Sequence, residues 1–336
     1  MIESTRISLV TDAWLPQVNG VTTTWTRIVA ELEASGHGVQ VVSPDHFATV
    51  PCPRYPEIRL ALAWSGARRL LSSQRPHAVH IATEGPLGLA CRAHCRRAGI
   101  PFTTSFHTRF PEYLRAYAHI PERVTYRLLR WFHDAAARTL VPTPSLQAEL
   151  ETRGFRNIMC WTRGVDTGLF RPRAEAFYPL PRPIFLYAGR VAVEKNLEAF
   201  LSLDLPGSKV VVGDGPARAA LERRFPFVHW AGFRFGEELA RHYAGADVFV
   251  FPSCTDTFGI VMLEANACGL PVAAFPVPGP ADLVVNGRNG ILHHDLRTAC
   301  LEALAVDRRR CREWSEQHTW RRCADLLLDN LAWIEA

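Results

Sequence analysis

One stretch of the sequence decides the fold: Val248-Phe249-Val250-Phe251-Pro252-Ser253-Cys254-Thr255-Asp256-Thr257-Phe258-Gly259, running on through Leu263-Glu264-Ala265 to Gly269-Leu270-Pro271-Val272. An apolar run of strand length leads into a polar loop, a helical pattern follows, and a second apolar run begins at Val272. Strand, helix and strand in this order form one unit of a parallel sheet covered by helices. We expect Asp256 or Thr257 to cap the helix, which places Glu264 about two turns beyond its start.

The two carboxylates of this stretch indicate a ligand. A helix N-terminus at the carboxyl end of a strand offers free backbone amides to an anion. A glutamate deeper in the helix, such as Glu264, can accept two hydrogen bonds from a vicinal diol such as ribose. Together these features fit a sugar nucleotide. The alternative is that Asp256 is a solvated capping residue and Glu264 an ordinary helical one.

Length and composition favour a globular protein of two domains. The chain has 336 residues, more than one hydrophobic core usually supports. No apolar run approaches the roughly 20 residues of a membrane-spanning helix, and the first residues lack the pattern of a secretion signal. We therefore expect a cytosolic protein, either free or bound to a membrane surface.

The net charge and the cysteine pattern reduce the range of ligands and cellular compartments to consider. The net charge of +5 suits a phosphate-rich ligand or an anionic membrane, but it is too small to indicate nucleic acid. Nine cysteines, without C-x-x-C spacing, favour reduced thiols over a disulfide framework. Cys91, His94 and Cys95 are a weak candidate for zinc, because His94 and Cys95 would not share a helix face.

Apolar strands alternate with helical patterns in both halves of the chain, which predicts two doubly wound α/β domains whose functional loops face each other across a cleft. Near residues 164–172 the alternation lapses and prolines become frequent, so we expect the linker there. The predicted domains are residues 1–168 and 169–336, with the option that the last helix returns to the first domain. The expected strands are 7–10, 39–43, 79–82, 102–105, 139–142, 184–188, 209–212, 228–231, 248–251 and 272–275, and the expected helices of the first half are 21–35, 87–97 and 145–153.

Glycines and cations follow several of these strands. Gly20 opens a helix, where a missing side chain lets a phosphate approach the backbone. Gly189 and Arg190 follow a strand of the second half, and Lys195 enters the next helix. Two cations five residues apart can clamp both phosphates of a diphosphate, although a surface ion-pair cluster is the alternative. The turn at Gly213 lacks the full dinucleotide fingerprint, which argues against hydride transfer.

His107 follows an apolar strand in the segment Thr104-Ser105-Phe106-His107-Thr108-Arg109-Phe110-Pro111-Glu112-Tyr113. A histidine at this place can orient a sugar hydroxyl or share a proton. The alternative is a structural or capping histidine.

The stretch from residue 113 to 138 is rich in cationic and aromatic side chains. On a helix, three arginines form one stripe beside a broad apolar face. The stripe is Arg123, Arg127 and Arg130, and the face is Val124, Leu128, Trp131, Phe132 and Ala135. This pattern suits an interfacial helix that touches anionic lipid, and it equally suits a helix packed on its own sheet.

In this order and combination, the motifs resemble the retaining GT-B glycosyltransferases of family 4 over nearly the whole chain. The matching segments are Asn19-Gly20-Val21, Ser105-Phe106-His107-Thr108, Gly189-Arg190 with Glu194-Lys195-Asn196, Gly213-Asp214-Gly215-Pro216, and the stretch from Pro252 to Val272. The form of residues 104–113 is most similar to the glycolipid-forming branch, which includes sulfoquinovosyl-, glucosyl- and glucuronosyl-diacylglycerol synthases.

The resemblance implies a role for individual residues. Arg190 and Lys195 would clamp the donor diphosphate, which the amide of Gly20 would reach from the opposite domain, and Glu264 would bind the ribose. His107 would lie beside the transferred sugar. The remaining donor-side candidates are Gly189, Gly213, Asp256, Phe258 and Gly259, the acceptor-side candidates are Arg109, Phe110 and Tyr113, and the membrane-surface candidates are Arg123, Arg127, Arg130 and Trp131.

One position departs from the family. The first acid of the family's pair is usually glutamate, and Asp256 is one methylene shorter. We expect an altered reach toward the sugar hydroxyls rather than lost activity.

The resemblance also implies the reaction: a retaining transfer of a hexose or hexuronic acid from a UDP-sugar to a lipid such as diacylglycerol, at the inner face of the cytoplasmic membrane. No metal or other cofactor is expected, because Arg190 and Lys195 can neutralise the leaving diphosphate. No nucleic-acid partner is expected. The alternative is a GDP-mannose-dependent α-mannosyltransferase, and a sugar-nucleotide 2-epimerase and a noncatalytic binder are less favoured.

Overall fold

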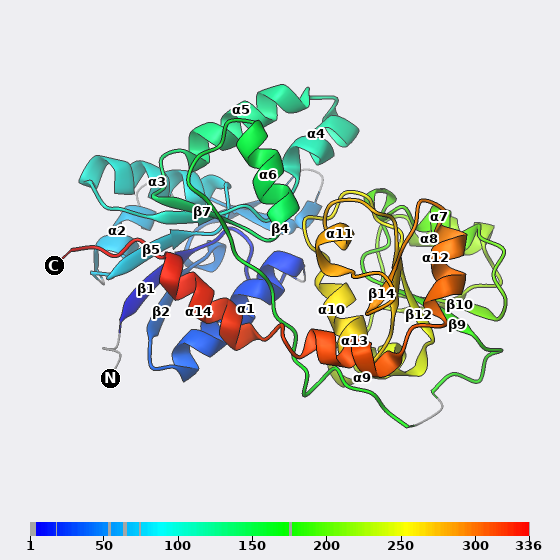
Figure 1. Ribbon diagram of the computed structural model, residues 1–336. Helices are drawn as coiled ribbons and strands as arrows, with labels where there is room; N and C mark the ends of the chain where they lie inside the picture. The colour runs from blue at the N-terminus through cyan, green and yellow to red at the C-terminus, as the bar shows by residue number, and fades with distance from the viewer. Residues whose placement is uncertain are drawn as a thin grey trace. The chain divides into compact units, whose positions relative to one another are not determined.

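The computed structural model describes residues 5–17, 19–52, 55–62, 66–73, 75–174 and 177–335 (Figure 1). The chain divides into two compact units. The first contains residues 1–162 and 320–336, and the second contains residues 163–319. The second unit thus begins six residues before the domain boundary that was expected from the sequence. The last helix belongs to the first unit.

A parallel sheet of six strands forms the centre of the first unit, in the order β2-β1-β5-β6-β7-β8. The order reverses between β1 and β5, so the loops after these two strands meet at a topological switch point. The strands are β1 (Arg6–Val10), β2 (Gly38–Val42), β5 (Ala78–Ile81), β6 (Thr103–Ser105), β7 (Arg138–Val141) and β8 (Ile158–Cys160).

Helices cover both faces of this sheet. On one face, α1 packs beside the C-terminal helix α14, as Figure 1 shows. On the other face, apolar side chains of α3 and α5 join one buried cluster with strands β1 and β5. The helices are α1 (Gly20–Ala34), α2 (Gly66–Ser73), α3 (Pro86–Ala98), α4 (Phe110–Ala118), α5 (Glu122–His133), α6 (Pro144–Thr152) and α14 (Trp320–Asn330), with a short 3₁₀ turn η1 (Pro44–His46).

A second, antiparallel sheet in the first unit was not expected from the sequence. It consists of β3 (Thr49–Cys52) and β4 (Tyr55–Ala61). A proline interrupts the apolar alternation in each strand, and β4 also contains Glu57 and Arg59, which removes the usual strand signal.

The second unit also has a parallel sheet of six strands, in the order β11-β10-β9-β12-β13-β14. Its order reverses between β9 and β12, where the two halves of a doubly wound sheet meet and ligands bind. The strands are β9 (Ile184–Ala188), β10 (Ser208–Val212), β11 (His229–Gly232), β12 (Val248–Phe251), β13 (Val272–Ala274) and β14 (Gly290–Leu292).

The strands of the second unit are buried on both faces, which is why they appear in the sequence as continuous apolar runs. Along β9, Leu186 packs in the cluster that contains Tyr243 of α9, while Phe185 packs in the opposite cluster with Phe200 of α7. The helices are η2 (Val193–Lys195, 3₁₀), α7 (Leu197–Leu201), α8 (Arg218–Arg224), α9 (Gly236–Gly245), α10 (Ile260–Ala267), α11 (Pro280–Leu283), α12 (Leu296–Ala303) and α13 (Arg308–Ser315).

The prediction of two doubly wound α/β domains is confirmed. Strands β9 and β12 have the residue bounds expected from the sequence. Two short strands, β8 and β14, were missed, because three residues at the edge of a sheet give little periodicity.

Candidate functional site

The loop between β12 and α10 carries the acidic residue expected to bind a sugar, but the helix after it begins later than predicted. Its N-cap is Gly259, without a side-chain capping bond, so the prediction that Asp256 or Thr257 caps the helix is wrong. Gly259 has a φ of +87°, and a Cβ there would lie 2.7 Å from Met262 Cε. Only glycine fits this left-handed turn, and Glu264 therefore lies one helical turn from the start rather than two.

Asp256 forms an ion pair with Lys195. The Nζ atom of Lys195 lies 2.5 Å from Oδ1 of Asp256, and the two side chains are 21% and 16% exposed. Lys195 follows β9 and Asp256 follows β12, so the pair spans the switch point of this sheet. The structure thus brings together the residue predicted to hold a diphosphate and the residue predicted to hold a sugar.

Two buried oxygen atoms of the same loop have no hydrogen-bond partner within the described part of the chain. They are Oδ2 of Asp256 and Oγ of Ser253. A buried polar atom without a partner costs about 1 to 3 kcal/mol, so such atoms usually mark a site that a ligand or water completes. The Asp256 carboxylate is therefore held at one oxygen by Lys195, and its other oxygen can accept a hydroxyl.

Glu264 is positioned by a tyrosine that the sequence analysis did not identify. The hydroxyl of Tyr243 on α9 donates to Oε2 of Glu264 at 3.0 Å. Burial, with the neighbouring Glu264 charge, raises the pKa of Tyr243 well above its usual value, so the phenol keeps its proton. Nothing in the sequence joins these residues, which are 21 positions apart on different helices.

Close packing between two loops requires glycine at some positions near this site. A Cβ at Gly213 would lie 1.9 Å from the carbonyl oxygen of Gly189, so the two loops can approach only without side chains. Arg190, which follows Gly189, is exposed, and Phe258 is buried. Ligand contacts of Gly189, Arg190, Gly213 and Phe258 stay predictions.

In the first unit, Gly20 opens α1 at the carboxyl edge of the sheet. The side chain of Asn19 accepts from the amides of Val21 at 3.0 Å and of Thr22 at 2.9 Å. Gly20 is exposed, and a Cβ there would meet nothing within 4 Å. The space beside this backbone is therefore open to a ligand, as the sequence analysis expected for a phosphate.

His107 is held by Trp25, a residue that the sequence analysis did not identify. The indole Nε1 of Trp25 donates to Nε2 of His107 at 2.9 Å, and the Ser105 hydroxyl also lies 2.9 Å from this nitrogen. An indole N–H can only donate, so Nε2 carries no proton and the neutral imidazole is protonated at Nδ1. Trp25 itself is 1% exposed and packs against the rings of His80 and Trp161.

The acceptor-side candidates have three different environments. Arg109 is 8% exposed and pairs with Glu149 at 2.8 Å and with Glu112 at 3.1 Å, so its contacts join the start of α4 to the second half of α6. Phe110 is 42% exposed at the start of α4. Tyr113 lies on the same helix, but its side chain is outside the described part of the structure. Contact of the three with an acceptor stays a prediction.

Comparisons with known proteins decide the family. The family model of Glycosyltransferase Family 4 matches residues 18–169, and that of Glycosyl transferases group 1 matches residues 182–305. A GDP-mannose-dependent alpha-mannosyltransferase of Mycobacterium tuberculosis (strain CDC 1551 / Oshkosh) is 33% identical over 315 residues, covering 85% of this chain and 83% of the relative. The chain belongs to glycosyltransferase family 4.

Other proteins similar to this family 4 glycosyltransferase are named for different activities. It is 31% identical to a sulfoquinovosyl transferase of Arabidopsis thaliana, over 85% of this chain and 62% of that protein. Among solved structures, the sucrose-phosphate synthase of Thermosynechococcus elongatus has a TM-score of 0.81 at 19% identity, covering 97% of this chain and 98% of that one. The structural likeness confirms the predicted GT-B fold.

Helix α5 of the glycosyltransferase packs on its own sheet, which was one of the two interpretations of the basic stretch, and its contact with a membrane stays a prediction. Its buried face consists of Thr125, Tyr126, Leu129, Phe132 and His133. Three residues of the expected apolar face point outward instead: Val124 is 54% exposed, Leu128 59% and Trp131 50%. The helix therefore packs on its sheet through one face and presents a second, partly apolar face to solvent.

Two of the membrane-surface arginines, Arg123 and Arg127, are exposed on the outer side of α5, and Arg130 is half-buried. Within the described residues, no helix of this glycosyltransferase is long and apolar enough to cross a bilayer.

Asp12 lies at the carboxyl end of a strand, where functional residues are common, but its contacts give it a structural role. It follows β1, and its carboxylate accepts from the amide of Leu87 at 2.9 Å and from the Thr83 hydroxyl at 2.8 Å. These bonds cap the N-terminus of α3, while burial raises the pKa of Asp12. The loops at the switch point of the first unit are thereby held together.

Proposed function

We propose that this family 4 glycosyltransferase transfers a hexose from a nucleotide-diphosphate sugar to a lipid acceptor, with retention of the anomeric configuration and without a metal ion. The observation that carries the proposal is the Lys195–Asp256 pair at the switch point of the second unit, where Oδ2 of Asp256 is buried and has no hydrogen-bond partner among the residues that the structure describes. A cation and an acceptor oxygen side by side suit a ligand that carries phosphate next to hydroxyl groups.

The chemistry follows from the charges that develop in the reaction. Cleavage of the bond between the anomeric carbon and the phosphate oxygen leaves negative charge on the diphosphate and positive charge on the sugar. Lys195 and Arg190 would stabilise the first, and the Asp256 carboxylate would stabilise the second. The acceptor oxygen bonds to the anomeric carbon from the leaving-group face, and its proton passes to a phosphate oxygen.

The nucleotide would be held deeper in the same unit. Glu264 would accept the two ribose hydroxyls, and the Tyr243 hydroxyl fixes the direction of its carboxylate by the bond of 3.0 Å. This arrangement needs no metal ligand, because the positive charge comes from side chains.

Two donors remain candidates. The motifs of residues 104–113 favour a UDP-sugar, as in the glycolipid synthases that they resemble. The M. tuberculosis relative at 33% identity is named GDP-mannose-dependent, and two further relatives with the same name, from Corynebacterium glutamicum and Mycolicibacterium smegmatis, are 31% and 32% identical. We therefore propose GDP-mannose as the first donor to test and a UDP-hexose as the second.

The lipid acceptor is supported by the outer face of α5. Exposed apolar side chains beside exposed arginines are the pattern of a helix that lies on an anionic membrane. A relative from Streptococcus pneumoniae that is 27% identical over 89% of this chain is named for a lipid product, as an alpha-monoglucosyldiacylglycerol synthase. We propose that the protein works at the inner face of the cytoplasmic membrane.

A donor and acceptor screen tests the proposal. Purified protein is incubated with EDTA and labelled GDP-mannose, UDP-glucose, UDP-galactose or UDP-glucuronate, with and without diacylglycerol vesicles. Label in the organic extract from one donor, dependent on the vesicles, supports lipid transfer and identifies the sugar. Donor isomerisation without acceptor would indicate an epimerase, and donor binding without turnover would indicate a noncatalytic protein.

A further inference from the structure

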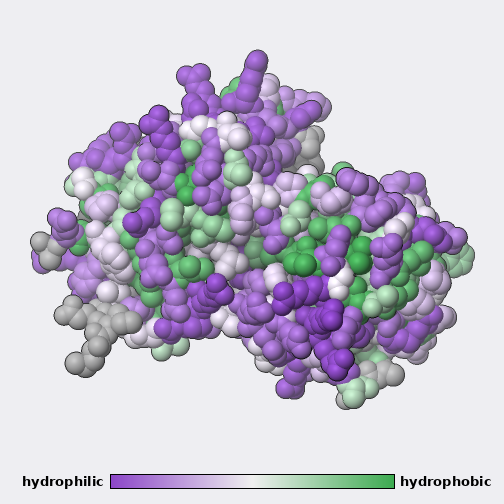
Figure 2. Space-filling view, viewed as in Figure 1, coloured by the Kyte–Doolittle hydropathy of each residue, from purple (hydrophilic) through white to green (hydrophobic). Residues whose placement is uncertain are grey.

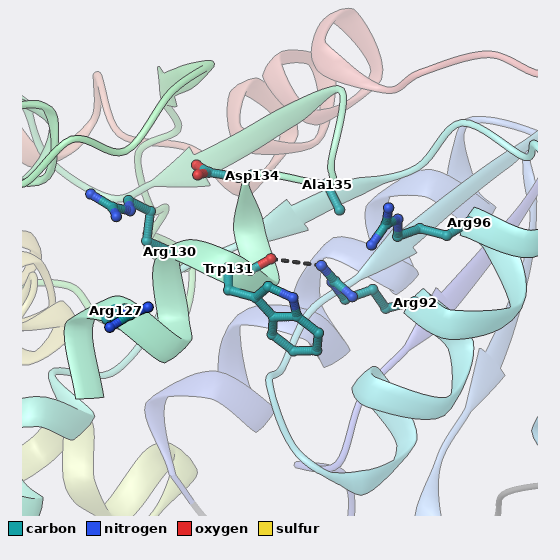
Figure 3. A pocket seen from close by; sticks show the side chains of 7 residues that line it. All are labelled: Arg92, Arg96, Arg127, Arg130, Trp131, Asp134 and Ala135. Atoms are coloured by element: carbon teal, nitrogen blue, oxygen red, sulfur yellow. Dashed lines mark hydrogen bonds between the residues drawn. The ribbon is translucent and has the colours of Figure 1, made fainter. Parts of the chain in front are cut away.

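The first unit has a basic hollow that contains three of the membrane-surface candidates, Arg127, Arg130 and Trp131. Its volume is about 390 Å³, and it lies between α3 and α5. We call it the arginine hollow. Its lining consists of Arg92 and Arg96 from α3, Arg127, Arg130 and Trp131 from α5, and Asp134 with Ala135 just after α5 (Figure 3).

The arginines of the hollow lack acidic partners. Within the described residues, no carboxylate lies within 4 Å of a guanidinium nitrogen of Arg92, Arg96, Arg127 or Arg130. Elsewhere in the same unit, Arg109 and Arg153 pair with Glu149. Four arginines against the single carboxylate of Asp134 leave an excess of positive charge, which an anion would neutralise.

Arg92 is the fixed part of the hollow. It is 4% exposed, and it donates to the carbonyl oxygens of Phe132 at 2.9 Å and Trp131 at 2.6 Å. Its guanidinium carbon lies 3.8 Å from the centre of the Trp131 ring. In Figure 3 the guanidinium group of Arg92 lies beside the Trp131 ring. Burial, together with the like charge of Arg96, lowers the pKa of Arg92. A phosphate beside it would offset both effects.

The surroundings of the hollow indicate where the anion comes from. Trp131, half of whose surface is exposed, belongs both to the hollow and to a stripe with Val124 and Leu128, which are four and three residues apart along α5. In Figure 2, the surface over α3 and α5 is mainly hydrophilic, with smaller hydrophobic areas between the hydrophilic ones. An apolar stripe inserts into the boundary between headgroups and acyl chains, which brings the neighbouring guanidinium groups to the level of lipid phosphates.

We propose that the arginine hollow binds the phosphate of an anionic phospholipid headgroup and so docks α5 on the bilayer. The inference rests on the membrane association proposed above and names its lipid chemistry. A headgroup phosphate would accept hydrogen bonds from Arg96, Arg127 and Arg130, while the Trp131 ring lies at the interface.

The test compares two double variants with the same change of charge. Arg96→Gln with Arg127→Gln removes two arginines that line the hollow. Arg97→Gln with Arg123→Gln removes two exposed arginines of the same two helices that do not line it. Arg92 is left intact because its bonds hold the end of α5. Equal melting temperatures of the variants show that both are folded.

Binding is measured by co-sedimentation with vesicles of phosphatidylcholine alone or with added phosphatidylglycerol, without donor sugar. We expect the wild type to prefer the anionic vesicles, and the hollow variant to bind them at least about tenfold more weakly than the control variant. Equal losses in the two variants would reduce the effect to diffuse charge attraction and overturn the site. Equal binding of the wild type to both vesicle types would also overturn it.

A second arm separates a lipid phosphate from a free one. Inorganic phosphate is added to the protein without vesicles, and the melting temperature is followed. A phosphate-dependent rise that the hollow variant lacks, without any preference for anionic vesicles, would assign the hollow to a soluble phosphate and contradict the lipid. Since no step needs turnover, these results are independent of whether glycosyl transfer to lipid is found.

Discussion

The indole Nε1 of Trp25 lies 2.9 Å from Nε2 of His107. Because an indole N–H can only donate, Nε2 is the hydrogen-bond acceptor of this imidazole ring. The two residues are 82 positions apart, on α1 and after β6. Any proton that His107 shares with a substrate must therefore be carried at Nδ1.

Replacing Trp25 by phenylalanine should release this nitrogen. Trp25→Phe keeps an aromatic ring but removes the N–H, so we expect a mixture of the two imidazole tautomers and a fall in transfer of roughly tenfold or more, within the range of general acid–base effects. Nitrogen-15 NMR of the histidine ring reads the tautomer directly.

Trp161→Phe is the matched control for that variant. Its ring centre lies 6.0 Å from that of His107, but its N–H donates to the carbonyl of Cys323 at 2.8 Å. An unchanged His107 tautomer in Trp25→Phe, or the same change in Trp161→Phe, would contradict the assignment.

Removing the Tyr243 hydroxyl should weaken donor binding more than catalysis. In Tyr243→Phe, the Glu264 carboxylate loses one hydrogen bond, and we expect KM for the donor to rise about three- to tenfold, as for a lost bond to a charged group, with kcat nearly unchanged. Steady-state kinetics with varied donor give both constants. Tyr178→Phe is the control, since its buried hydroxyl bonds His242 instead, and an equal rise of KM there would point to a general loss of stability.

The pair of Lys195 and Asp256 should act as a unit. Asp256→Asn preserves the shape of the side chain but removes the charge that would stabilise the developing positive charge of the sugar, so we expect kcat to fall by roughly a hundredfold. A cycle with Lys195→Met should show effects that do not add, because each variant already breaks the pair. Additive losses in kcat would mean that the two side chains act independently.

The Arg109 cluster should stabilise the first unit in a pH-dependent way. Burial acts to raise the pKa of Glu149, but the hydrogen bonds and charges of Arg109 and, to a smaller extent, Arg153 outweigh it and hold this pKa below its usual value. The stabilisation is therefore complete above the ordinary glutamate range and is lost as the pH falls through the lowered pKa.

Arg109→Met should cost about 1 to 3 kcal/mol near neutral pH, because Glu149 then keeps only Arg153 and Glu112 only the Tyr126 hydroxyl. The cost should be smaller in acid, where Glu149 is protonated. Urea unfolding at several pH values checks this. Arg115→Met is the control, as Arg115 pairs with Glu122 at the surface. A loss for Arg109→Met that does not depend on pH would show that packing, rather than charge, explains the effect.

The sequence predicted the fold well because its strands are buried on both faces. Ile184–Ala188 and Val248–Phe251 are wholly buried, so their apolar runs mark the strands without ambiguity. The predicted start of α10 was wrong because the left-handed turn at Gly259 depends on contacts with Phe251 and Met262. Local capping rules contain no such contacts.

The sequence identified several residues of the site, but it did not show which of them contact one another. Lys195 and Asp256 were named for separate tasks, and only the sheet order, with β9 beside β12, shows that they meet. Trp25 and Tyr243 were missed because a single apolar or aromatic residue on a helix has no local signal of its partner. The outer face of α5 was ambiguous for the same reason, since Val124, Leu128 and Trp131 would look alike in a core or at a membrane.

The most direct test of the account is the amount of hexose that enters lipid from the preferred donor, measured in EDTA with the wild type and with Lys195→Ala. We predict vesicle-dependent label in the organic extract for the wild type and on the order of a hundredfold less for the variant, as expected for lost charge stabilisation of the leaving diphosphate. Equal labelling by the two proteins, or label that stays in the aqueous phase with every donor, would contradict the account.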